Sequence, residues 1–175
     1  NGGGWGTIAE GDTGDIEAIA LDGDDSIIEN IAAQTTTGAA TDKVSVSGSG
    51  ARSIARLVKS INSDDPSGGV SIASVAGLLL GVIVLDYDGR GIYQTGARQR
   101  IIGNSVAAAG AGTLAITLVT ANDDSVVTGN IFQTTDANVL DSGASNIVLV
   151  GNRLDGAPTD SGTNNTIAAN DTEAF

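Results

Sequence analysis

The residues best suited to chemistry stand together in one short stretch, which contains both tyrosines of the chain, two carboxylates and a guanidinium. Tyrosine rings stack on sugar rings, and Asp and Arg side chains bind hydroxyl or acidic groups. This combination within so few residues indicates a glycan-binding patch. The predicted patch consists of Asp86, Tyr87, Asp88, Arg90 and Tyr93.

Asp86 and Asp88 also meet the minimal requirement of a glycoside hydrolase, because two residues on alternate positions of a strand share one face. Nothing in the sequence indicates the desolvation that would raise the pKa of either carboxyl toward neutral pH. A third interpretation is a polar turn in which Arg90 pairs with one of the Asp residues. Binding, catalysis and a structural turn all stay open, and no catalytic residue is assigned.

Metal and cofactor chemistry find little support in the sequence. Asp22, Asp24 and Asp25 crowd one turn, but they lack the spacing of a calcium loop and its distant Glu, so we expect a solvated acidic turn. The chain has no His and therefore lacks the usual general base and every Ser-His-Asp arrangement. It has no Cys for a disulfide or a thiolate. We expect no metal and no cofactor, and whether the chain is an enzyme stays open, with the balance against it.

A short phrase recurs in the second half of the chain: a few apolar residues, a small residue, then Asn. It ends, at spacings of 18 to 26 residues, at Asn104, Asn130, Asn152 and Asn170. Runs of three or four Ile, Val and Leu between Gly, Asn, Asp and Ser predict short strands and tight turns. One copy cannot bury its own apolar face, so the copies are expected to stack, with the Asn side chains forming a ladder at one corner.

These phrases resemble the degenerate repeats of right-handed parallel β-helix proteins, the pectate-lyase-like superfamily that includes virus tailspikes. The resemblance covers residues 24–170 at most. It implies an all-β fold, a right-handed parallel β-helix of about six or seven short rungs. We expect residues 16–175 to form this single domain and residues 1–15 to be a Gly-rich arm or linker. The family includes lyases, hydrolases and inert stalks, so the resemblance implies no activity.

The most apolar passage, residues 70–85, does not alternate as a half-buried strand should. With 16 residues it is too short to cross a bilayer. Its outward side chains must therefore be covered, either by a loop of the same chain or by another copy, and fibrous β-helices that resemble this one assemble as trimers. The expected self-association residues are Leu78, Leu79, Leu80, Val82, Ile83, Val84 and Leu85. Residues 53–61 fit a helical stripe as well as a strand, and the repeat favours the strand.

The chain carries 21 acidic and 8 basic residues, for a net charge of −13. This charge repels phosphates and anionic lipid, so neither nucleic acid nor a membrane is an expected partner. An acidic, Lys-poor composition resembles proteins of extreme halophiles, in which strong salt screens self-repulsion. An ordinary acidic secreted protein is the alternative.

Together these features predict a non-enzymatic structural and adhesive module of a virus particle. It would be a tail fibre, spike or capsid-surface projection of a tailed virus, with a halophilic host. Its expected location is the virion surface or the extracellular space, and its expected partners are copies of itself, other virion proteins and host-surface polysaccharide or glycoprotein. The alternatives are a polysaccharide lyase or glycoside hydrolase with carboxylate catalysis, and a secreted cell-surface β-helix protein.

Overall fold

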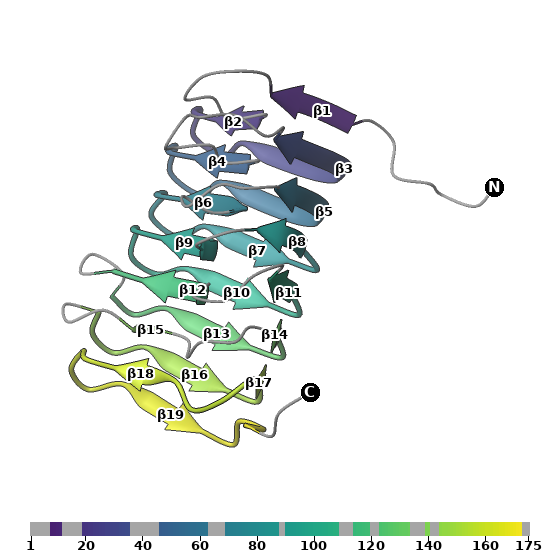
Figure 1. The fold of residues 1–175 in the computed structure, drawn as a ribbon. Coiled ribbons are helices and arrows are strands. Elements are labelled where there is room, and N and C mark those ends of the chain that lie inside the picture. Colours follow the sequence, from purple (N-terminus) through teal and green to yellow (C-terminus); the bar gives the residue numbers. More distant parts are fainter. Residues whose placement is uncertain are drawn as a thin grey trace.

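The protein is an upright stack of β-strand coils (Figure 1). A computed structural model describes residues 8–11, 19–35, 46–62, 69–87, 90–108, 114–119, 123–133, 139–140 and 144–172. Every regular element in these residues is a strand, and every strand pair is parallel. The prediction of an all-β parallel solenoid is therefore confirmed.

Each coil has three arms, named here in the order in which the chain visits them. The third arm closes one coil and leads into the next. It is a 7-stranded sheet that contains β2 (Ile19–Leu21), β4 (Val46–Gly48), β6 (Val70–Ile72), β9 (Arg90–Gln94), β12 (Leu114–Leu118), β15 (Val139–Leu140) and β18 (Thr159–Asp160).

The first arm follows the third and is the broad face at the front of Figure 1. It stacks the N-terminal parts of β3 (Ile27–Thr35) and β5 (Ile54–Asn62) on β7 (Leu78–Leu80), β10 (Arg100–Ile102), β13 (Val126–Thr128), β16 (Val148–Val150) and β19 (Thr166–Ala168). Of residues 53–61, all but Ser53 are thus strand, and none is helix.

The second arm stacks the C-terminal parts of β3 and β5 on β8 (Ile83–Tyr87), β11 (Ser105–Ala108), β14 (Ile131–Gln133) and β17 (Arg153–Leu154). Above them β1 (Ile8–Gly11) pairs with β3, with Ile8 opposite Ala32. Four residues of the predicted Gly-rich arm are therefore a strand of the sheet.

Two left-handed residues bend each coil around its first arm, one before the arm and one after it. The first corner is formed by Asp25, Arg52, Ala76, Arg98, Asp124, Asn146 and Asn164, with φ between 56° and 61°. The second corner, five residues later each time, is formed by Asn30, Leu57, Gly81, Gly103, Gly129, Gly151 and Ala169. Glycine recurs at the second corner because a left-handed backbone costs other residues about 1–2 kcal/mol.

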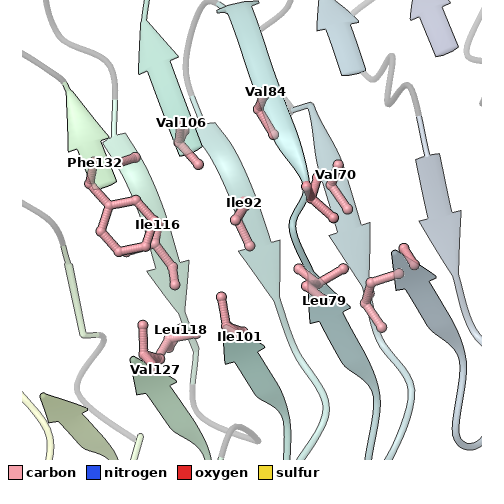
Figure 2. Packing of buried hydrophobic residues seen from close by; sticks show 14 of the residues in the cluster. Val70, Leu79, Val84, Ile92, Ile101, Val106, Ile116, Leu118, Val127 and Phe132 are labelled. Carbon is pink, nitrogen blue, oxygen red and sulfur yellow. The ribbon is translucent and has the colours of Figure 1, made fainter. Parts of the chain in front are cut away.

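The core is a set of vertical columns in which each coil contributes one inward side chain per register position. The central column of the first arm consists of Ile28, Ala55, Leu79, Ile101, Val127, Leu149 and Ile167. Figure 2 shows Leu79, Ile101 and Val127 on successive strands, facing the same interior as Ile92 and Ile116 of the third arm. Each fully buried aliphatic side chain contributes about 1.5–3 kcal/mol, so coils that are too short to fold alone are stable when stacked.

The apolar passage around β7 and β8 alternates after all, because Gly81 occupies a corner and resets the pattern. Leu79, Val82 and Val84 point into the core and are at most 1% exposed. These three of the seven expected self-association residues are therefore corrected to core residues. The four that remain at the surface are Leu78, Leu80, Ile83 and Leu85.

Candidate functional site: the outer face of the first arm

The four repeat Asn residues form one hydrogen-bonded column inside the second corner. Asn104 Nδ2 donates to Asn130 Oδ1 at 2.9 Å, Asn130 Nδ2 donates to Asn152 Oδ1 at 2.8 Å, and Asn152 Nδ2 donates to Asn170 Oδ1 at 3.0 Å. Each Oδ1 also accepts the backbone N–H of the residue above it in the column, beginning with Val82. The Nδ2 of each of the four residues also donates to a backbone carbonyl of the coil above.

This ladder is structural. Asn104, Asn130 and Asn152 are 1–2% exposed, so a ligand in solvent cannot reach them. Burying a side-chain amide without hydrogen-bond partners costs free energy, and in this ladder both the Nδ2 and the Oδ1 of each buried Asn have partners. The column fixes the corner and thereby the register of the arms on either side of it.

The predicted glycan-binding patch is divided between two arms. Asp86 and Tyr87 lie at the end of β8 in the second arm, Arg90 and Tyr93 lie in β9 of the third arm, and Asp88 lies outside the described residues. The Arg90 guanidinium carbon lies 4.5 Å from the centre of the Tyr93 ring in a cation–π contact. Arg90 therefore covers one of the two ring faces on which a sugar would stack.

The acidic turn that was considered for calcium is held by the protein's own donors. Asp22 accepts a hydrogen bond from Ser49 Oγ, and Asp24 accepts one from the backbone N–H of Ala51, both at 2.9 Å. Asp25 binds Arg52 through both oxygens. These bonds tie the coil of β3 to the coil of β5.

A surface that the sequence did not reveal is the outer face of the first arm. Its outward side chains are mostly aliphatic, and we call this surface, together with the first corner beside it, the arginine face. The aliphatic members are Ile27, Ile54, Leu78, Leu80, Ile102, Val126, Val148 and Val150. Ile27 is 58% exposed and Leu80 is 39% exposed, so solvent reaches apolar surface of a kind that proteins usually cover.

Four of the six arginines of this acidic chain lie on the same face. Arg52 and Arg56 are on the coil of β5, and Arg98 and Arg100 are on the coil of β10. The coil of β7 between them carries Ala76 at the corner, so no long side chain fills the space.

The result is a hollow of about 460 Å³ with an aliphatic floor and arginines at its rim. It is lined by Asp25, Ile27, Arg52, Ile54, Ala76, Gly77, Leu78, Arg98 and Arg100.

The arginines on the two coils differ in their partners. Asp25 Oδ1 and Oδ2 lie 2.5 and 2.7 Å from Arg52 Nε and Nη2, and this hydrogen-bonded pair lowers the pKa of Asp25. Arg56 pairs with Glu29 of the coil above through Oε2 alone, which both Nε and Nη2 of Arg56 contact. Neither Arg98 nor Arg100 forms an ion pair with any residue that the structure describes. The upper arginines are therefore neutralised, and the lower two have charge available for a partner.

Comparisons with protein-family models, curated proteins and solved structures found no match for the chain. In the described part of the chain no helix could cross a membrane.

The sequence does contain a signal for the arginine face, namely two closely spaced pairs of arginines. One pair is Arg-x-x-x-Arg at residues 52–56, and the other is Arg-x-Arg at residues 98–100. Their relation became visible only once the coil register placed them on one surface.

Proposed function

We propose that the protein is a non-enzymatic structural module that assembles with copies of itself through the arginine face. The observation that carries this proposal is the aliphatic surface of the first arm, which is partly open to solvent over successive parallel strands from β3 to β16 and most exposed at Ile27, Leu80 and Val148. Exposure of apolar surface to water costs about 25 cal/mol of free energy for each Å², and association recovers this free energy by burying the surface.

The rigidity of the stack supports this role. Backbone hydrogen bonds run from coil to coil, and the ladder of Asn104, Asn130 and Asn152 fixes one corner of it. The outward residues therefore hold fixed positions before association, so little side-chain and backbone entropy is lost when copies associate. A preformed and extended surface suits assembly better than it suits turnover of a substrate.

We place this module at a virion surface or in the extracellular space. The support for this setting is the resemblance of the repeats to those of tailspike-type β-helix proteins. Contact with a host glycan through Arg90 and Tyr93 belongs to the same proposal.

Sedimentation equilibrium of two matched variants tests the assembly. Leu80→Asp places a charge on the arginine face, whereas Ile131→Asp places the same charge on the second arm at a position of similar exposure, 42% against 39%. We expect the wild type and Ile131→Asp to sediment as assemblies and Leu80→Asp to sediment as a monomer. A wild type that stays monomeric at high concentration would overturn the proposal.

A further inference from the structure

We infer that the partner on the arginine face is a second copy in antiparallel orientation, related by a two-fold axis that runs along the strands between β10 and β13. This inference rests on the proposed function and adds the orientation and the register of the assembly. It follows from the distribution of charge along the first corner and of aliphatic residues along the first arm.

The first corner is divided into two halves of different chemistry. Its upper half contains Asp25 and Arg52, which neutralise each other, then the small Ala76 and the cationic Arg98. Its lower half contains Asp124, Asn146 and Asn164, which offer carboxylate and amide oxygens. A carboxylate is the natural partner of a guanidinium, so each half is complementary to the other and not to itself.

A parallel arrangement does not use this complementarity. A three-fold axis along the stack, with the arginine faces turned toward it, would set every coil at the height of the same coil in its neighbours. Arg98 and Arg100 would then meet their own counterparts, and Asp124 would meet Asp124. Like charges opposite one another are destabilising, so the trimer that the sequence suggested is disfavoured through this face.

The two-fold axis reverses the order of the coils and keeps each column opposite the same column. The coil of β10 then faces the coil of β13 of the second copy, and Arg98 lies opposite the second copy's Asp124. Because the axis is two-fold, this contact occurs twice. One Asp124 oxygen already accepts a bond from Asn146 Nδ2 at 3.0 Å, which orients the carboxylate and leaves the other oxygen for Arg98.

The same register matches the aliphatic residues. The strand β7 faces β16 of the second copy, so that Leu78 and Leu80 lie opposite Val148 and Val150. The hollow beside Ala76 faces the second copy's Asn146, whose amide is short enough to enter it. Apolar contacts at the centre and charged contacts at the edge are the usual arrangement of a protein interface.

Charge reversal in trans tests this register. Arg98→Asp alone sets Asp against Asp124, and Asp124→Arg alone sets Arg against Arg98, so each variant should dissociate at least tenfold more readily than the wild type. A mixture of the two variants restores two opposite-charge contacts and should give a heterodimer with a dissociation constant near that of the wild type. Sedimentation of each variant, alone and mixed, measures this.

Both substitutions suit the backbone of this left-handed corner, because the chain itself places Arg and Asp there. Lys59→Asp is the control for net charge, since it makes the same charge change on the second arm, and it should sediment as the wild type does. An assembled wild type whose two variants fail to recover in the mixture would overturn the antiparallel register and leave self-association standing. A monomeric wild type would remove the proposed function itself.

Discussion

The side-chain amide of Asn104 donates to the side-chain oxygen of Asn130 one coil below, at 2.9 Å, and both residues are 1% exposed. The two are 26 residues apart in sequence. The same oxygen accepts the backbone N–H of Asn104 at 2.8 Å. One side chain therefore satisfies two donors of its neighbour, which explains why the corner repeats Asn and not merely any small polar residue.

Removal of the central ladder residue should be costly. Asn130→Ala removes Oδ1, so the backbone N–H of Asn104 loses its acceptor and Asn104 Nδ2 keeps only its bond to a backbone carbonyl. It also removes Nδ2, which donates to Asn152 Oδ1 and to the carbonyl of Ile101, and each buried group left without a partner costs about 1–3 kcal/mol. We expect a loss of about 3–5 kcal/mol in the free energy of unfolding, measured by urea denaturation. Asn170→Ala is the control at the lower end of the column, where partial exposure lets water replace the lost bonds, and it should cost about half as much. Equal losses in the two variants would argue against the ladder.

A second pair of buried amides should respond in opposite directions. Gln94 is fully buried between Ile72 and Leu118 of its column, and neither Nε2 nor Oε1 has a hydrogen-bond partner among the described residues. Gln99, equally buried, donates to the carbonyl of Ser74. Gln94→Leu should raise the free energy of unfolding by about 1–3 kcal/mol, and Gln99→Leu should lower it by about 1–2 kcal/mol. A destabilising Gln94→Leu would show that this amide has a partner.

The left-handed backbone of the second corner predicts whether introducing or removing glycine there stabilises or destabilises the protein. Leu57 has φ 49° and is 49% exposed, so Leu57→Gly relieves left-handed strain at the cost of some backbone entropy. We expect a net gain of about 0.5–1 kcal/mol in thermal or urea denaturation. Gly129→Ala, where the nearest atom to an added Cβ would be 3.9 Å away, should lose about 1 kcal/mol through conformation alone. The account of the corner would be wrong if both substitutions shifted stability the same way.

The exposed pair of Asp25 and Arg52 should make stability depend on pH. The hydrogen bond from Arg52 lowers the pKa of Asp25 in the folded protein. The contribution of this pair to the free energy of unfolding is therefore complete above the ordinary pKa of Asp and is lost as the pH falls through the lowered pKa. The difference in stability between the wild type and Asp25→Asn should be present at pH 7 and shrink below pH 4. In an Arg52→Ala background the same comparison should show little change with pH, and a persistent change would point to another partner.

The fold class was accessible from the sequence because its signals are local. Gly-Asn at the ends of short apolar runs specifies a left-handed corner followed by an inward amide, and both requirements are met by neighbouring residues. The same reasoning failed to recognise the alternation of inward and outward side chains in residues 70–85. The corner at Gly81 interrupts the period of two, so the sequence reads as one unbroken apolar run. A corner at Leu57 interrupts β5 in the same way and produced the false helical stripe.

The arginine face could not be predicted from the sequence, because it depends on the register between coils. Arg52 and Arg98 are both at first corners, yet Asp, Ala and Asn occupy the same corner in other coils, so residue type does not mark the position. The coil lengths vary as well, so the sequence alone does not show that Ala76 separates the two arginines. The predicted patch around Tyr93 was chosen from sequence proximity, and the chain divides it between two arms.

Both proposals depend on the register of neighbouring coils, which cysteine cross-linking measures directly because the chain has no Cys of its own. Ser105 and Ile131 are register partners on β11 and β14, and adjacent strands bring their Cα atoms within about 5 Å, which a disulfide can span. Ser105 and Gln133 are two positions out of register, about 8 Å apart, which is too far. We expect the Ser105→Cys, Ile131→Cys protein to form an intramolecular disulfide on oxidation and the Ser105→Cys, Gln133→Cys protein to stay reduced. A disulfide in the second protein, or none in the first, would contradict the stacked register on which the arginine face is built.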